Sequence, residues 1–85
     1  MNVNSSDWVA TVAALVLDGF AYLDLLTAID RLDEIEVVLH LIRPDDHADV
    51  FLHTRTPDAR LDSLTTVLPA ASWHEREIGE MFGVE

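Results

Sequence analysis

The side chains with the greatest potential for chemistry lie between Trp73 and Gly83, near the end of the sequence. Five of them can carry charge, namely His74, Glu75, Arg76, Glu77 and Glu80. An imidazole beside a carboxylate can bind a metal ion, and paired carboxylates can act as a general acid and base. An arginine between acidic neighbours can instead present a planar set of donors to a partner. The segment is therefore chemically compatible with metal binding, proton transfer or protein recognition.

The pair His74-Glu75 matches the opening of the zinc-protease motif His-Glu-x-x-His. That motif needs a second histidine one helical turn later, and the residue at that position is Ile78. The inverted motif and the di-iron pattern also need histidines that this segment lacks. We therefore expect no metal ion at this segment.

No enzyme template is completed by the rest of the sequence. The glycines do not form a glycine-rich phosphate loop, and Ser63 and Ser72 lack the glycines that flank a hydrolase nucleophile. A general acid and base could be chosen among Glu75, Glu77 and Glu80, but such pairs are common in a protein with 16 acidic residues. We expect no independent catalytic activity from this protein.

The local sequence predicts that a helix positions the charged side chains. Ser72 is followed three residues later by Glu75, which fits a capping box in which each side chain accepts a hydrogen bond from the other residue's amide. Gly83 suits the left-handed conformation that ends many helices. The predicted helix runs from about Trp73 to Phe82.

The predicted helix has two different faces. At 3.6 residues per turn, one face is mostly apolar and consists of His74, Ile78, Met81 and Phe82. The other face consists of Trp73, Arg76, Glu77 and Glu80. Exposed ion pairs contribute only about 0.2–1 kcal/mol to stability. The second face is therefore either a solvated charge cluster or a surface that presents Arg76 to a partner.

The order of residues in this segment favours the second alternative. The pattern Trp-x-Glu-Arg-Glu-x-x-(Asp/Glu)-Met-Phe-Gly-(Ile/Val), preceded by Leu68-Pro69-Ala70-Ala71, resembles the signature of the 30-kDa subunit family, or C subunit, of respiratory complex I, the NADH-quinone oxidoreductase. The resemblance includes two earlier segments, at 20–30 and 36–41, which are similar to the first two strands of that family. It therefore extends over most of the sequence.

The resemblance implies an α+β domain in the hydrophilic arm of complex I, on the cytoplasmic side of the bacterial inner membrane. Such a protein is a peripheral, non-redox structural subunit that packs against the D subunit, which helps to form the quinone pocket, and assembles with the B subunit. NADH, FMN, the iron–sulfur clusters and quinone would be bound by partner subunits, so we expect no cofactor here. The resemblance assigns interface or structural roles, and no catalytic ones, to Trp73, Glu75, Arg76, Glu77, Glu80, Phe82 and Gly83.

Two features depart from the family pattern. Gly79 occupies a helix position that is usually larger, at a cost in helix stability of about 1 kcal/mol relative to alanine. The sequence also ends at Glu85, where the family continues past Phe-Gly into a C-terminal extension. We therefore expect a truncated or shortened bacterial member. The alternatives are a homologous subunit of a membrane-bound hydrogenase or F420-type oxidoreductase, and a free-standing acidic protein-binding domain.

Composition limits the remaining functions. The 85 residues suffice for a single domain, 1–85, whose small core would gain stability from contacts with other proteins. The absence of cysteine excludes disulfides, thiolate catalysis and iron–sulfur ligation by thiolates. A formal charge of -11, with no lysine, makes nucleic acid a poor partner and a basic protein surface a better one. We find no apolar run long enough to span a membrane.

Hydrophobic periodicity predicts the elements that support the charged helix. A first helix should run from Ser6 or Asp7 to about Asp18 and stop at Gly19, with a core face made of Trp8, Val12, Leu15 and Val16. Later elements are strands at 20–26, 36–42 and 49–55, a polar connection through Asp30, Arg31, Asp33 and Glu34, and a short helix at 62–68. The predicted fold is α+β, with an N-terminal helix, a small mainly antiparallel sheet with a central β-hairpin, and a C-terminal helix.

The register of the central hairpin can also be predicted. If residues 44–47 form its turn, Val38 faces His53 and Leu39 faces Leu52. One face is then a dry core surface of Ile35, Val37, Leu39, Leu41, Val50 and Leu52. The opposite face consists of Glu36, Val38, His40, Ile42, Asp49, Phe51, His53 and Arg55, and it is more apolar than a solvent face needs to be. Its two histidines would lie near each other, as a metal pair without a third ligand or, more simply, as surface histidines.

Overall fold

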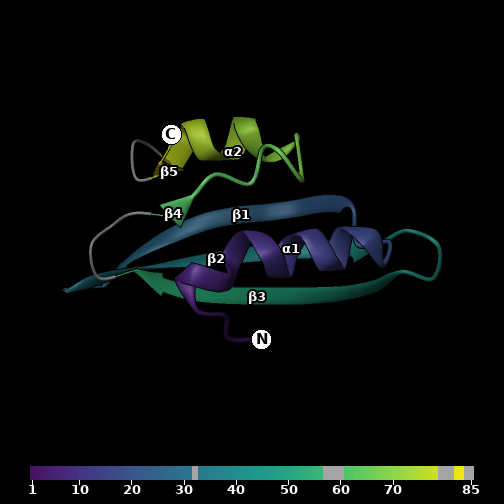
Figure 1. The fold of residues 1–85 in the computed structure, drawn as a ribbon, viewed down its shortest axis with the longest axis horizontal. Coiled ribbons are helices and arrows are strands. Elements are labelled where there is room, and N and C mark those ends of the chain that lie inside the picture. The colour runs from purple at the N-terminus through teal and green to yellow at the C-terminus, as the bar shows by residue number, and fades with distance from the viewer. Residues whose placement is uncertain (32, 57–60, 79–81, 84–85) are drawn as a thin grey trace.

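The structure, a computed structural model, describes residues 1–31, 33–56, 61–78 and 82–83. In sequence order its elements are a 3-10 helix η1 (Ser5–Asp7), helix α1 (Trp8–Leu17), strands β1 (Tyr22–Arg31), β2 (Glu34–Arg43), β3 (Ala48–Thr56) and β4 (Leu61–Asp62), helix α2 (Ala71–Ile78) and strand β5 (Phe82–Gly83). Figure 1 shows α1 across one face of the sheet and α2 on the side of β1. The predicted α+β fold is confirmed.

The main sheet is a meander of three antiparallel strands in the order β1-β2-β3. The β2–β3 hairpin has the predicted register, because Val38 pairs with His53 and Leu39 pairs with Leu52. Alternation explains this success, since a shift by one residue would move every apolar side chain to the wrong face. A second, parallel pair joins β4 to β5, with Leu61 opposite Phe82.

The turn of the β2–β3 hairpin is fixed by local hydrogen bonds. The His47 amide donates to the Arg43 carbonyl at 2.8 Å, and the Ala48 amide donates to Asp46 Oδ1 at 3.2 Å. The guanidinium of Arg43 donates to both oxygens of Asp46, at 3.0 Å each. His47 has a φ of 61°, in the left-handed region that histidine enters more easily than β-branched residues do. These contacts set the turn that determines the register.

Helix α1 ends at the predicted stop, Gly19, which has a φ of 100°. The amides of Gly19 and Phe20 donate to the carbonyls of Val16 and Leu15, as in a glycine-terminated helix. A Cβ at Gly19 would lie 2.9 Å from Cδ of Arg43, and the positive φ would strain any larger residue at this position. The guanidinium carbon of Arg43 lies 4.6 Å from the ring centroid of Phe20. One side chain thus links the end of α1 to the end of β2.

Strand β1 is longer than predicted. It extends to Arg31 instead of ending near Leu26, so Asp30 and Arg31 belong to the strand and not to a polar connection. Its register with β2 shifts between Leu23 and Leu25, which makes a bulge at Asp24. Pairing along the whole length of β2 overrides the weak strand propensity of the acidic residues, because sheet context decides such cases. Pairing with β1 also extends β2, which begins at Glu34 instead of the predicted Glu36.

The helix predicted over residues 62–68 is wrong. The segment begins as strand β4 and continues as a turn, while the Leu64 amide donates to a carboxylate oxygen of Glu75 at 2.7 Å. The Thr65 amide donates to the Ser63 hydroxyl at 3.2 Å. Side chains thus satisfy backbone amides locally, which competes with helix formation.

The ends of helix α2 also differ from those predicted for the C-terminal helix. It begins at Ala71, before the predicted Trp73, because the amides of Ala71 and Ser72 already donate to the Leu68 and Pro69 carbonyls. Phe82 pairs with β4 and is not helical. Residues 79–81 lie outside the described residues.

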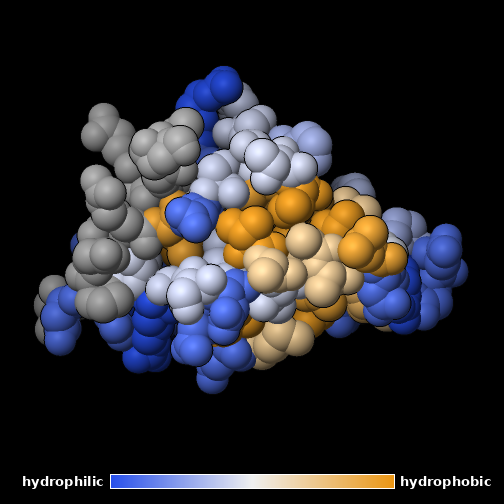
Figure 2. Space-filling model, in the orientation of Figure 1, coloured by the Kyte–Doolittle hydropathy of each residue, from blue (hydrophilic) through white to orange (hydrophobic). Residues whose placement is uncertain are grey.

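The core lies between α1 and the face of the sheet that α1 covers. Its fully buried apolar side chains are Trp8, Val12, Val37, Leu39, Leu41, Leu52, Leu64 and Ala71. The predicted core face of the first helix is confirmed, since Leu15 and Val16 pack against this cluster. Figure 2 shows that apolar side chains also reach the surface on this side, where Ala10, Ala14 and Leu17 of α1 are exposed.

Candidate functional site

Helix α2 divides its residues between an inward and an outward face. Ala71 and Glu75 are buried. Trp73 is 60% exposed, and Arg76 and Glu77 are exposed beside it. Within the part of the sequence that the structure describes, Arg76 forms no ion pair. These three predicted interface residues therefore point outward, and their interface role stays a prediction.

Among the other predicted interface residues, Glu75 belongs to this helix, whereas Phe82 and Gly83 do not. Phe82 and Gly83 form β5 and pair with β4. Glu80 lies outside the described residues together with Gly79.

Glu75 anchors α2 to the preceding segment. The Ser63 hydroxyl donates to Glu75 Oε1 at 2.7 Å, and the Leu64 amide donates to Glu75 Oε2 at 2.7 Å. The predicted capping box between Ser72 and Glu75 is therefore wrong. Because α2 begins at Ala71, Ser72 lies within its first turn and is exposed, while Glu75 faces inward. The carboxylate fixes the position of the helix rather than its first turn.

Among the described residues, His74 belongs to no group of candidate metal ligands. Its Nδ1 is buried and has no hydrogen-bond partner in the described structure. Among residues 1–31, 33–56, 61–78 and 82–83, we find no group of three histidine, cysteine or acidic side chains that could hold a metal ion.

A second cluster of charged side chains lies on the sheet face that α1 does not cover. His40 bridges two carboxylates, because its Nδ1 lies 2.8 Å from Asp24 Oδ2 and its Nε2 lies 2.8 Å from Asp49 Oδ2. The cluster joins all three strands, since Asp24 is in β1 and Asp49 in β3. Hydrogen bonds to Asp49 and then to Asp24 raise the pKa of His40 above its usual value, because both favour the imidazolium. The ring of Phe51 stacks on the imidazole, with the centroids 4.0 Å apart.

A neighbouring network on the same face is centred on Glu36, which is buried. Arg31 donates to Glu36 Oε1 at 2.7 Å, and His53 Nδ1 lies 3.1 Å from Glu36 Oε2. These hydrogen bonds, first from Arg31 and then from His53, lower the pKa of Glu36. Arg55 donates to Glu34 at 3.0 Å. The two histidines predicted to be neighbours are thus each engaged by carboxylates and not by each other.

The sequence predicted that this sheet face carries both polar and apolar side chains, but it did not predict the contact between Asp24 and His40. Alternation placed His40 and Asp49 on one face, and the structure confirms that placement. The bulge that brings Asp24 to the same imidazole was not predicted, because an extra residue in a strand has no clear signal in alternation alone.

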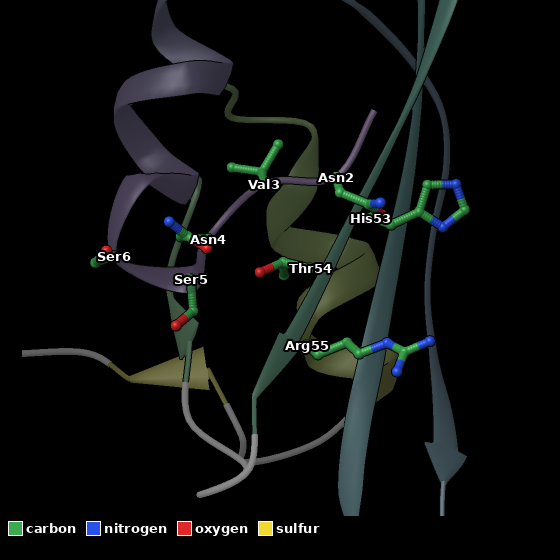
Figure 3. A pocket seen from close by; sticks show the side chains of 8 residues that line it. All are labelled: Asn2, Val3, Asn4, Ser5, Ser6, His53, Thr54 and Arg55. Carbon is green, nitrogen blue, oxygen red and sulfur yellow. The ribbon is translucent and has the colours of Figure 1, made fainter.

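A cleft of about 580 Å³ lies between the N-terminal segment and the edge of β3 (Figure 3). It is lined by Asn2, Val3, Asn4, Ser5, Ser6, His53, Thr54 and Arg55. Figure 3 shows that Thr54 points toward the N-terminal segment, whereas the side chains of His53 and Arg55 turn to the other side of β3. The basic groups therefore do not converge in the cleft, and none of the predicted interface residues lines it.

Comparison with known proteins decides the family. The family model described as respiratory-chain NADH dehydrogenase, 30 Kd subunit, matches residues 1–85. This chain therefore belongs to that family. Its membership confirms the resemblance inferred from the segment between Trp73 and Val84.

Individual relatives show how much of each protein is matched. The C/D subunit of NADH-quinone oxidoreductase from Methylococcus capsulatus is 46% identical over 50 residues, which cover 56% of this 30 Kd family member and 8% of that protein. The C subunit from Chelativorans is 35% identical over 69 residues, which cover 76% of the family member and 34% of that protein. The matched sequence thus spans less than half the length of either relative.

A solved structure also has this fold. One protein of the membrane-bound sulfane sulfur reductase, an archaeal respiratory membrane complex, superposes with a TM-score of 0.86 and 28% identity. The match covers 99% of this family member and 53% of the protein in that complex. Among the residues that the structure describes, no helix is long and apolar enough to cross a membrane.

Proposed function

We propose that this protein is a non-redox structural component of the hydrophilic arm of an NADH-quinone oxidoreductase, where α2 docks to the D subunit. The carrying observation is the division of α2 between a buried anchor, Glu75, and an exposed face of Trp73, Arg76 and Glu77. This division occurs in a sequence whose whole length matches the 30 Kd subunit family.

The exposed face of α2 has the composition of a protein-binding surface. Tryptophan and arginine are enriched among the residues that dominate binding energy at interfaces. Trp73 offers a large ring that is 60% exposed, and Arg76 offers a planar donor group without an ion-pair partner among the described residues. The hydrogen bonds of Glu75 hold this helix in place before binding, which lowers the entropic cost of docking.

The choice of the D subunit as the neighbour has support from the relatives. The relative from Methylococcus capsulatus is named as a C/D subunit of NADH-quinone oxidoreductase, a name that joins both components. In the proposed assembly this protein is peripheral, lies on the cytoplasmic side of the bacterial inner membrane and also contacts the B subunit. NADH, FMN, iron–sulfur clusters and quinone are bound by partner subunits, so the purified protein should not oxidise NADH with artificial acceptors.

A second candidate is the same structural role in a related membrane-bound respiratory complex. It is favoured by the fold match to a protein of the sulfane sulfur reductase complex. The two candidates differ in the subunits that should accompany this protein, so its partners distinguish them.

The test is affinity purification of the complex through this protein from its native host. We expect the D and B subunits of an NADH-quinone oxidoreductase to be recovered with the wild type. Arg76→Ala should lower the recovery of the D subunit at least tenfold, because a half-paired interfacial charge costs about 2–5 kcal/mol. Asp45→Asn, at an exposed carboxylate in the hairpin turn, is the matched control and should leave recovery unchanged.

Three outcomes count against the proposal. Recovery of the protein alone would contradict any assembly role. Recovery of a reductase or hydrogenase complex without NADH-quinone oxidoreductase subunits would favour the second candidate. Normal recovery of the D subunit with Arg76→Ala and with Trp73→Ala would mean that α2 is not the docking face.

A further inference from the structure

The sheet face opposite α1, here called the open face, carries an unusual concentration of exposed apolar side chains. Seven large apolar side chains are exposed among the described residues, and four of them are on this face: Tyr22, Leu25, Ile29 and Phe51. Their exposed fractions range from 40% to 57%. In Figure 1 this face is turned away from the viewer, behind the strands that α1 crosses. Large apolar side chains gathered on one exposed face are typical of a site of protein interaction.

Most charges on the open face are already compensated. Arg31 pairs with Glu36, and Arg55 pairs with Glu34. The exception is the His40 cluster, in which Asp24 and Asp49 share a single imidazole. With that imidazole protonated, two carboxylates still face one cation, so one negative charge remains uncompensated.

The two aspartates are also accessible to a partner. Their side chains are 48% and 54% exposed, whereas the imidazole between them is only 12% exposed. Each carboxylate uses Oδ2 to bind His40, and Oδ1 has no partner in the described structure. The ring of Phe51, stacked on the imidazole, is 46% exposed. An apolar ring and two free carboxylate oxygens are therefore presented together.

We propose that the open face binds a second neighbouring protein, which inserts an arginine against Asp24, Asp49 and Phe51. A guanidinium can donate to carboxylate oxygens while its plane stacks on an aromatic ring, which a lysine ammonium does less well. Its single positive charge brings the cluster to neutrality. The flanking apolar side chains, Tyr22, Leu25 and Ile29, then pack against an apolar surround of that arginine. This inference rests on the proposed function only in that the assembled complex supplies the neighbour.

The first experiment places a photocrosslinking residue, p-benzoylphenylalanine, at Phe51 in the full-length protein within its native complex. We expect one dominant crosslinked peptide from another subunit, with an arginine close to the crosslinked site. The control position is Thr66, which is exposed and lies between β4 and α2. It should not yield the same peptide.

The second experiment measures how well that neighbour is retained on the purified complex. The double variant Asp24→Asn/Asp49→Asn should reduce retention at least tenfold at constant salt, and Asp45→Asn should not. Substitution of the partner's arginine by alanine should give the same loss, with no further loss when it is combined with the double variant. Leu25→Ser keeps the His40 cluster intact and should still weaken retention, which covers the case that the double variant folds poorly.

The proposal is overturned if the crosslink goes to lipid, to a second copy of this protein, or to a peptide without a basic residue. Full retention with a correctly folded double variant also overturns it. The same measurements separate failure of the open-face proposal from failure of the proposed docking of α2 to the D subunit. Loss of the D subunit on substitution of Arg76, with no effect of the Asp24 and Asp49 substitutions, supports α2 and rejects the open face. The reverse pattern supports the open face alone.

Discussion

The two faces of the main sheet use alternate residues of the same strands for different purposes. On the covered face, Val37, Leu39, Leu41 and Leu52 are fully buried and have no polar atoms to satisfy. On the open face, Glu36 and His40 are held by charged neighbours, and large apolar side chains remain exposed. Burial of one leucine side chain contributes about 1.5–3 kcal/mol, whereas an exposed ion pair contributes about 0–1 kcal/mol. The covered face therefore determines stability, and the open face is free to serve recognition.

Substitutions on the covered face should cost the most stability. Leu39→Ala should lower the free energy of unfolding by about 2–5 kcal/mol, because it leaves a cavity in a closed core. Val38→Ala, at the adjacent residue on the open face, should cost less than about 1 kcal/mol, since this side chain is only partly buried. Urea unfolding of both variants measures the difference. Equal losses would break the distinction between the two faces.

Helix α2 should show the same difference between a buried and an exposed position. Glu75→Gln should lower the free energy of unfolding by about 1–3 kcal/mol, because one of its two donors, the part-buried Ser63 hydroxyl or the buried Leu64 amide, loses its acceptor. The matched control is Glu77→Gln, at an exposed position of the same helix, which should stay within about 0.5 kcal/mol of the wild type. Thermal unfolding followed by circular dichroism compares them. A large loss at Glu77 and none at Glu75 would reverse the assigned faces.

On the open face, we expect substitution of His40 to have a smaller effect on stability, and one that depends on pH. The pKa of His40 is raised in the folded protein, so its stabilising contribution is complete below the unfolded value of 6.5 and is lost as pH rises through the folded pKa. The stability difference between wild type and His40→Gln should therefore be largest near pH 6 and should shrink toward pH 9. Asp24 and Asp49 face the imidazole, and Phe51 stacks on it. A pH-independent difference in urea unfolding would contradict this assignment.

The stabilising contribution of Glu36 should depend on pH in the opposite direction to that of His40. Its pKa is lowered, first by Arg31 and then by His53, so its stabilising contribution is present above the unfolded value of 4.5 and is lost as pH falls through the folded pKa. The stability advantage of the wild type over Arg31→Gln should therefore disappear in acid when both are unfolded in urea. An advantage that persists unchanged at low pH would show that Arg31 does not act through the Glu36 carboxylate.

The smallest expected effect is that of Arg76→Ala on the isolated protein. The free energy of unfolding should change by no more than about 0.5 kcal/mol, because the side chain is exposed and has no ion pair among the described residues. Urea unfolding provides the measurement. A loss of several kcal/mol would identify Arg76 as an internal clamp, and the docking role of α2 would have to be abandoned.

The sequence predicted those parts of the fold in which local pattern and tertiary packing agree. Strict alternation around the turn at 44–47 determined the register of β2 and β3, and Gly19 was correctly placed as the end of the first helix. The end of β1 was misplaced because pairing with β2 keeps Asp30 and Arg31 extended despite their polarity. The segment 62–68 was misplaced because long-range contacts with Glu75 replace helical hydrogen bonds.

For the candidate site, too, local pattern predicted only part of the arrangement. Helical spacing was enough to place Trp73, Arg76 and Glu77 on one exposed face. It could not show that Glu75 turns inward to Ser63, because that contact joins residues 12 positions apart. Nor could it show that Asp24 reaches His40, which depends on a bulge and a contact across 16 positions.

The pairing order of strands β1, β2 and β3 affects when helix α2 takes its place during folding. Strands β1, β2 and β3 each pair with a neighbour in sequence, so their contacts close short loops at low entropic cost. Hairpins form within about 1–10 μs. During synthesis, all three strands leave the ribosome before α2 does, because they precede it in the sequence. The open face should therefore be complete before α2 takes its place. If both proposed interactions occur, a nascent polypeptide would bind its open-face neighbour before the neighbour of α2.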